Sequence, residues 1–172
     1  MQRVIIFDSP DGTGKTNIAK SLSGVLGIPY FKMNTEHDNW RAGRFKDALE
    51  FDQPYLLQFL KQTGHSAIID RAYPAEWVYS RIYRRETNDE LLRELDYGFS
   101  RLGTNIVIPL RNSYAGSRKD ELVRGEVLPL LHEGYINFSA WTVCHAIPIY
   151  VDELGNDLLG ELREIIPRLE FL

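Results

Sequence analysis

The residues with the clearest chemistry lie in one short segment, residues 9–16, which reads SPDGTGKT. This segment follows the pattern G-x-x-x-x-G-K-[ST] except at its first position, where Ser9 stands in place of glycine. Its two glycines allow successive backbone N–H groups to point inward and form a nest for an anion. Lys15 would reach the β and γ phosphates of a nucleoside triphosphate, and Thr16 would ligate Mg²⁺. The segment therefore predicts a site for ATP and Mg²⁺ made by Asp11, Gly12, Thr13, Gly14, Lys15 and Thr16.

The serine at the first position of this loop has two alternative interpretations. Ser9 adopts the conformation of the usual glycine less easily, or its hydroxyl serves the substrate, and the sequence does not separate the two.

A second pair of candidate residues follows an apolar run further along the chain. Asp70 closes the run SAIID, so it is expected at the carboxyl edge of a sheet, where open α/β sheets bind their ligands. A carboxylate at that place can hold Mg²⁺ through water. The guanidinium of Arg71 offers a fork of donors that fits phosphate oxygens in two-point contact. We therefore expect Asp70 beside the metal and Arg71 beside a phosphate.

Predicted strands and helices alternate along the chain, and they must position these residues. The alternation predicts an α/β fold with a parallel sheet that is covered by helices on both faces. The strands are expected at residues 4–7, 28–33, 66–70, 104–110 and 147–151. The helices are expected at residues 15–26, 38–50, 53–63, 74–85, 88–101, 119–133, 134–144 and 153–169, with Pro129 kinking or ending its helix.

Residues 8–16 and the Asp70-Arg71 pair resemble the phosphate loop and the Asp-Arg element of thymidylate kinases and their deoxynucleoside kinase relatives. The element order is similar over nearly the whole chain, and the short length resembles compact viral members of this group. The resemblance implies a P-loop NTPase-like three-layer sandwich with strand order 2-3-1-4-5. It implies ATP-dependent phosphorylation of a deoxynucleoside monophosphate, with dTMP or a modified dUMP such as 5-hydroxymethyl-dUMP as the leading acceptor.

The two aspartates in or before the loop point to different acceptors. By the resemblance, Asp11 corresponds to a thymidylate kinase residue that binds the sugar 3′-hydroxyl, and Asp8 to a deoxynucleoside kinase residue that acts as a base on the 5′-hydroxyl. A monophosphate is already deprotonated, whereas a sugar hydroxyl needs a base. The sequence therefore leaves a deoxynucleoside kinase, with Asp8 as a catalytic residue, as an alternative.

Further acceptor contacts are expected from basic and aromatic side chains. Arg41 and Arg44 lie three residues apart on a predicted helix and share a face that could grip the acceptor phosphate. The candidates to stack on the base are Phe51, Tyr55, Tyr73 and Trp77.

The polar segment after the fourth predicted strand, about residues 111–120, is expected to be a lid. The resemblance implies that such a lid closes over the phosphates and brings arginines to the transition-state charge, which also keeps water out. Arg111 and Arg118 are the candidate catalytic residues in it, and Gly116 gives it mobility. The sequence does not decide between the two arginines.

Composition limits the remaining possibilities. The chain has 172 residues, 44% of them hydrophobic, a net charge of −4 and one cysteine. We expect a single cytosolic domain over residues 1–172, or a protein of the host cytoplasm if it is viral, without a membrane span, disulfide or zinc site. The negative charge disfavours nucleic acid as a partner. A kinase of a hydroxymethylated pyrimidine in DNA and a nucleotide-triggered switch protein remain alternatives, and the resemblance suggests a homodimer.

Overall fold

A computed structural model describes residues 1–33, 48–114, 125–151 and 157–171 of the chain. Most of the helix predicted over residues 38–50 and most of the predicted lid lie outside these described residues. Arg41, Arg44, Gly116 and Arg118 are therefore among the predicted site residues that receive no structural account.

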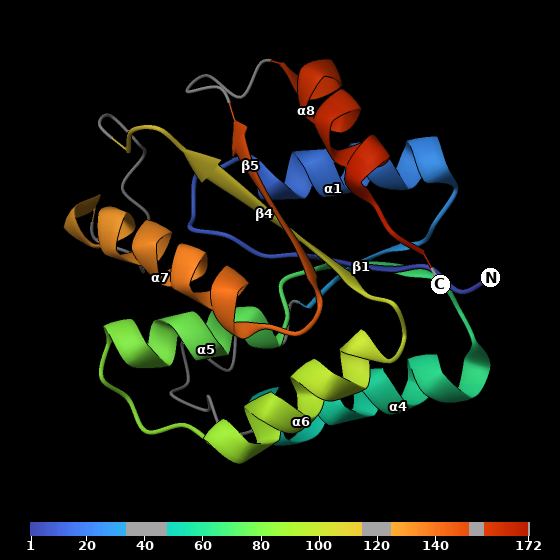
Figure 1. Cartoon of the computed structure of the whole chain (residues 1–172), viewed down its shortest axis with the longest axis horizontal. Coiled ribbons are helices and arrows are strands. Elements are labelled where there is room, and N and C mark those ends of the chain that lie inside the picture. The colour runs from blue at the N-terminus through green and yellow to red at the C-terminus, as the bar shows by residue number, and fades with distance from the viewer. Residues whose placement is uncertain (34–47, 115–124, 152–156, 172) are drawn as a thin grey trace.

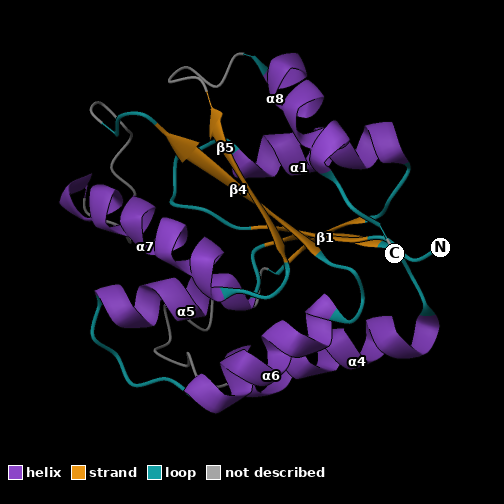
Figure 2. Ribbon diagram, viewed as in Figure 1, coloured by secondary structure: helices purple, strands orange, loops and turns teal. Residues whose placement is uncertain are grey.

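Five parallel strands form one sheet in the order β2-β3-β1-β4-β5. Figure 2 shows the sheet between two layers of helices. Every strand pair is parallel, so the predicted fold class and strand order are confirmed. The strands are β1 (Val4–Phe7), β2 (Tyr30–Lys32), β3 (Ala67–Asp70), β4 (Asn105–Arg111) and β5 (His145–Val151).

Helices cover both faces of this sheet (Figure 1). One face carries α1 (Lys15–Leu26) and α8 (Leu158–Ile165). The other face carries α4 (Gln53–Thr63), α5 (Tyr73–Ile82), α6 (Asp89–Ser100) and α7 (Leu128–Trp141), and a π-helical turn, η1 (Ala48–Asp52), leads into α4. Short 3₁₀ turns, η2 (Gly125–Val127) and η3 (Ile166–Arg168), precede α7 and follow α8.

The central strand shows how the sequence builds both layers. Ile5 and Phe7 point into the core under α1 and α8, while Val4 and Ile6 point into the core under α5 and α7. Successive strand residues face opposite sides of a sheet, so an unbroken apolar run is required where both sides are covered. The burial of these side chains drives the assembly of the three layers.

Strand register brings the predicted site residues to one edge. Phe7, the last residue of β1, pairs with Asp70 on one side and with Val107 on the other. Because the strands are parallel, the loop after β1 and the Asp70-Arg71 pair after β3 emerge at the same carboxyl edge. The sheet therefore assembles the candidate site from segments more than 50 residues apart in sequence.

The expected break between two helices at residues 133 and 134 is wrong. Pro129 was expected to kink or end a helix over residues 119–133, with a further helix over 134–144, but one helix runs through Leu128–Trp141 with Pro129 in its first turn. A proline is tolerated there because the first-turn N–H groups have no partner within the helix.

A buried carboxylate ties three elements together on the α6 side of the core. Asp96 of α6 is fully buried and accepts hydrogen bonds from the Tyr73 hydroxyl at 2.7 Å, from the Val143 amide at 2.9 Å and from the Thr142 hydroxyl. Burial also raises the pKa of the nearby Cys144 thiol to about 12.

None of the helices formed by the described residues combines the length and apolar character of a membrane-spanning segment.

Removal of this carboxylate is expected to destabilise the fold. Asp96→Ala should lower the free energy of unfolding by roughly 2–4 kcal/mol, because three donors, one of them the buried Tyr73 hydroxyl, lose their acceptor. Urea unfolding followed by circular dichroism measures this. Glu94→Ala, an exposed change on the same helix, is the control, and an equal loss in both variants would contradict the assigned role.

Candidate functional site

The loop between β1 and α1 folds as a cradle at the start of a helix. Gly12 and Gly14 have φ angles of +79° and +76°, a region that favours glycine. Gly14 caps α1 without any side-chain hydrogen bond, and the first turn of α1 holds no acidic residue. The amides of Lys15 and Thr16, the first two residues of α1, are thus left for an anion, with the positive end of the helix dipole behind them. Residues 10–17 line a cavity of about 170 Å³.

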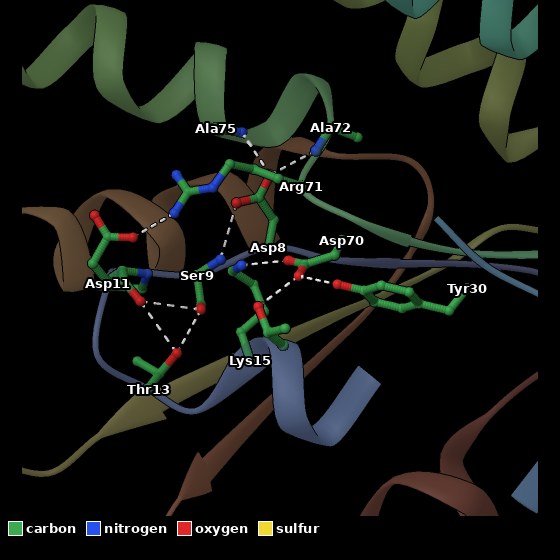
Figure 3. Close-up of polar contacts among 12 residues, drawn as sticks. Asp8, Ser9, Asp11, Thr13, Lys15, Tyr30, Asp70, Arg71, Ala72 and Ala75 are labelled. Atoms are coloured by element: carbon green, nitrogen blue, oxygen red, sulfur yellow. Dashed lines mark hydrogen bonds and ion pairs between the residues drawn. The ribbon is translucent and has the colours of Figure 1, made fainter. Parts of the chain in front are cut away.

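Ser9, which replaces the usual first glycine, makes hydrogen bonds to other residues of the same loop. Its backbone does not adopt a left-handed conformation, so glycine is not required at this position. Its hydroxyl lies 2.6 Å from the Thr13 hydroxyl, so that one of the two donates to the other, and the Pro10 carbonyl accepts within reach of both, 3.2 Å from the Ser9 hydroxyl and 3.1 Å from the Thr13 hydroxyl (Figure 3). Ser9 and Thr13 are buried. Of the two alternatives left by the sequence, this geometry fits neither: the hydroxyl braces the loop itself.

The carboxylate of Asp70 collects three donors (Figure 3). Lys15 forms an ion pair with its Oδ1, while the hydroxyls of Thr16 and Tyr30 donate to its Oδ2 at 2.6 and 2.7 Å. Burial alone would raise the pKa of Asp70, but the Lys15 charge and these hydrogen bonds outweigh it and hold the pKa below the ordinary value. Asp70 is therefore an anion bound directly to the phosphate loop.

Arg71 follows with a left-handed backbone, φ +76°, which costs a non-glycine residue roughly 1–2 kcal/mol. The turn is fixed by the Arg71 amide, which donates to the Phe7 carbonyl at 2.8 Å. It directs the guanidinium to Asp11, whose Oδ1 lies 2.5 Å from Nη2. The Tyr79 hydroxyl donates to the other oxygen of Asp11 at 3.4 Å, and its ring lies under the guanidinium. Arg71 and Asp11 therefore form a partly exposed pair beside the loop.

Asp8 has a structural place that differs from its expected catalytic role. It is fully buried, and its Oδ2 accepts the Ala72 and Ala75 amides at 3.1 and 3.0 Å, at the start of α5. Its Oδ1 accepts the Ser9 amide at 3.0 Å and the Tyr135 hydroxyl at 2.7 Å. Burial raises the pKa of this carboxyl, against the nearby Arg71 charge and the Tyr135 hydrogen bond. With both oxygens occupied and no exposed surface, Asp8 does not reach a sugar hydroxyl in this structure.

Oxygen donors suited to magnesium meet at the same edge. The Thr16 hydroxyl and the Asp70 carboxylate are in direct contact, and both are hard ligands that Mg²⁺ accepts. Across the described part of the chain, no three His, Cys, Asp or Glu side chains cluster as a metal site. The residues thus fit Mg²⁺ bound through few protein oxygens together with phosphates, the usual arrangement for this ion.

Two of the predicted base-stacking residues are in the core instead. Tyr73 has no exposed surface and stacks on Phe99, with ring centroids 5.6 Å apart. Trp77 is 7% exposed and packs against Phe138 and Trp141. Their expected contact with a base is therefore wrong for this geometry, because apolar partners already cover both rings. Phe51 on η1 is 66% exposed and remains a candidate.

The described part of the predicted lid begins at the end of β4. Arg111 is the last residue of this strand, and its amide donates to the Tyr114 hydroxyl at 3.4 Å. It leaves the sheet at the same carboxyl edge as the phosphate loop.

Three site residues were missed by sequence reasoning. Tyr30, Tyr79 and Tyr135 each bring a hydroxyl to an aspartate of the site. Their sequence separations from those aspartates are 40, 68 and 127 residues, so no local spacing indicates the contacts. The only available signal was that Tyr30 lies within the strand predicted at residues 28–33, which the resemblance places beside the strand of Asp70.

Comparisons with known proteins give fold-level matches. No protein-family model and no curated protein matches this sequence. Among solved structures, the YorR protein of Bacillus subtilis, in complex with phosphorylated GDP, is 20% identical with a TM-score of 0.60, over 93% of this chain and 96% of its own. A deoxyadenosine kinase from M. mycoides with dCMP and dCDP is 19% identical with a TM-score of 0.57, over 96% and 98%.

Two further matches widen the range of acceptors. A thymidylate kinase from Ehrlichia chaffeensis is 17% identical with a TM-score of 0.53, over 96% of this chain and 98% of its own. A gluconokinase from Sinorhizobium meliloti 1021 is 15% identical with a TM-score of 0.59, over 97% and 91%. This chain therefore has the P-loop kinase fold, and because the matches are kinases with different names, the acceptor must be argued from the site.

The Ser9–Thr13 contact predicts energetic coupling within the loop. Ser9→Ala and Thr13→Val should each destabilise the protein, and the double variant should lose about 1 kcal/mol less than the sum of the two. Urea unfolding of all four proteins completes the cycle. Additive losses would show that the hydroxyls do not stabilise each other.

The ion pair at Asp70 predicts a stability change that depends on pH. Lys15→Met should raise the pKa of Asp70, which in the wild type lies below 3.8. Ionised Asp70 contributes stability above its unfolded pKa and loses it as pH falls through the folded pKa. The destabilisation caused by Lys15→Met should thus be larger at about pH 7 than at about pH 3, as measured by urea unfolding at each pH. A pH-independent difference would argue against the ion pair.

Proposed function

We propose that this chain is an ATP-dependent kinase that transfers the γ-phosphoryl group to the phosphate of a deoxynucleoside monophosphate. The observation that supports a phosphate as the acceptor, rather than a sugar hydroxyl, is that Asp8 is buried and both of its carboxylate oxygens accept hydrogen bonds. A sugar hydroxyl needs a base to lose its proton, whereas a phosphate oxygen is a nucleophile without one. dTMP, or a modified dUMP such as 5-hydroxymethyl-dUMP, is the leading acceptor on the resemblance given above.

The donor side of the proposal rests on the phosphate loop. The free amides at the start of α1 and the Lys15 ammonium would bind the phosphate chain of ATP. Thr16 directly, and Asp70 through water, would hold Mg²⁺, which neutralises phosphate charge when it is bound. Lys15 and Thr16 now contact Asp70, so nucleotide binding would exchange these contacts for contacts with phosphate and metal.

The acceptor side rests on the Arg71–Asp11 pair. Arg71 is 24% exposed at the mouth of the loop, where its fork of N–H groups could bind the acceptor phosphate and the transferring group. Asp11 could bind the 3′-hydroxyl, and Phe51 could stack on the base. The acceptor oxygen would then form a bond to the γ-phosphorus as the bond to the β–γ bridging oxygen breaks. Positioning and charge neutralisation supply the catalysis.

Other parts of the proposal fall on residues without a structural account. Arg41 and Arg44 would grip the acceptor phosphate, and Arg118 would complete the lid with Arg111. We also propose that residues 1–172 act as one kinase domain with a lid at residues 111–120, and that two copies form a homodimer.

A deoxynucleoside kinase is the second candidate. It is favoured by the Asp11 carboxylate, which is 28% exposed beside the loop and could act as the base that Asp8 cannot provide. The fold-level match to a deoxyadenosine kinase is consistent with it.

A substrate panel decides between these functions. The purified protein with MgATP should release ADP at least about tenfold faster with one deoxynucleoside monophosphate than with any nucleoside or with hydroxymethylated DNA. Phosphorylation of thymidine rather than dTMP would establish the second candidate. Nucleotide binding without acceptor-stimulated ADP release would instead favour a switch protein.

The proposed role of Arg71 depends on the two-point contact of its guanidinium group with phosphate, and not on its positive charge alone. Arg71→Lys should lower kcat by about 10²-fold with little change in the KM for ATP, because one ammonium cannot make the two-point contact. Steady-state kinetics measures this against Arg81→Lys, a change at an arginine that stacks on Trp77 outside the site. Near-normal kcat in Arg71→Lys would reject the assigned role.

A further inference from the structure

Tyr30 is a site residue that belongs neither to the phosphate loop nor to the Asp70-Arg71 pair, and it contacts Asp70 itself. It opens β2, and its hydroxyl donates to Oδ2 of Asp70 at 2.7 Å (Figure 3). Its half-buried ring packs against the apolar cluster under α1, with the Lys20 ammonium 5.6 Å from the ring centroid. The side chain is therefore held at both ends, by packing at the ring and by the carboxylate at the hydroxyl.

The three donors on Asp70 differ in what nucleotide would do to them. This argument rests on the proposed function. Lys15 and Thr16 belong to the phosphate loop, so a bound triphosphate and its metal would take both of them from Asp70. Tyr30 belongs to the sheet, and a phenol is neither a usual phosphate anchor nor a usual magnesium ligand. Of the donors that the described residues give to Asp70, Tyr30 is the one that stays.

The sheet keeps Tyr30 and Asp70 in fixed relation. Strand β2 pairs with β3 in parallel, with Tyr30 opposite Ile68 and Lys32 opposite Asp70. No loop movement is needed for the hydroxyl to follow the carboxylate. Burial, followed by the hydrogen bond to Asp70, raises the pKa of Tyr30 above its ordinary value, so the hydroxyl remains a donor through the physiological range.

We propose that Tyr30 is a positioning residue that holds the Asp70 carboxylate in place for the Mg²⁺ of the bound nucleotide. A carboxylate with only one oxygen fixed can point its other oxygen at the metal or at a water on the metal. If Lys15 and Thr16 moved to the nucleotide and Tyr30 were absent, none of these three donors would hold the Asp70 carboxylate, and it would be free to rotate. Groups that orient a metal-binding carboxylate typically change metal affinity by about 10–100-fold when they are removed.

Tyr30→Phe tests the proposal because it removes the hydroxyl and keeps the ring packing. The measurement is the affinity for a fluorescent ATP analogue, without divalent ion and over a Mg²⁺ titration. In Tyr30→Phe, the Mg²⁺ concentration for half-maximal enhancement of binding should rise about tenfold, while affinity without Mg²⁺ stays within about twofold of wild type. Tyr97→Phe, which removes a hydroxyl from a half-exposed tyrosine of α6, is the matched control and should change neither value.

A cycle with Asp70→Asn shows whether Tyr30 acts through that carboxylate. In the Asp70→Asn background, Tyr30→Phe should have no further effect on the Mg²⁺ titration. An unchanged titration in the single variant, an equal loss of affinity with and without Mg²⁺, or additive effects in the double variant would each overturn the proposal. A wild-type protein that binds no nucleotide would overturn the proposed function as well, which separates the two failures.

Discussion

The parallel pairing of β1 with β3 is the constraint on which the site depends. It sets Phe7 opposite Asp70, and so places the residues that follow both strands within contact of each other at one edge of the sheet. The Asp8 carboxylate then accepts hydrogen bonds from two backbone amides at the start of α5, and the Arg71 amide donates to the Phe7 carbonyl. A shift of register by one residue would turn every side chain of the shifted strand to the opposite face of the sheet and would separate these partners.

Both cations of the site are paired with carboxylates of the protein itself. Three carboxylates, those of Asp8, Asp11 and Asp70, surround two cations, Lys15 and Arg71, and each cation has a carboxylate in direct contact. Under the proposed function, a triphosphate adds negative charge to a site that has no excess of positive charge among the described residues. Divalent metal and the arginines of the lid region would then be needed to offset the repulsion.

The sequence predicted the parts of the site that depend on local pattern. The strand, the glycine-containing turn and the helix of residues 4–26 follow from short-range spacing, and the closing position of Asp70 follows from an apolar run. The strand order came from resemblance, because alternation of elements alone does not order a sheet. Local pattern also gave one wrong boundary at Pro129, where the proline begins a helix.

Contacts made by tyrosine side chains were beyond such reasoning. A tyrosine can bury its ring while its hydroxyl bonds a residue that is not its direct neighbour across the sheet. Tertiary packing decides which residue accepts that hydrogen bond. Tyr73 and Trp77 were predicted to stack on a base but lie in the core, and the contacts of the Tyr30 and Tyr135 hydroxyls were not predicted. Aromatic spacing on a helix indicates that a face is apolar but not what covers it.

The buried thiol has a practical consequence. Cys144 is the one cysteine of the sequence, it lies in the core, and its pKa of about 12 leaves almost no thiolate near neutral pH. Two cysteines introduced on the surface, one on α4 and one on α8, would react with maleimide dyes or spin labels, and the native cysteine would not have to be replaced first. Distances between α4 and α8 could then be followed in solution by spectroscopy on an otherwise unmodified chain.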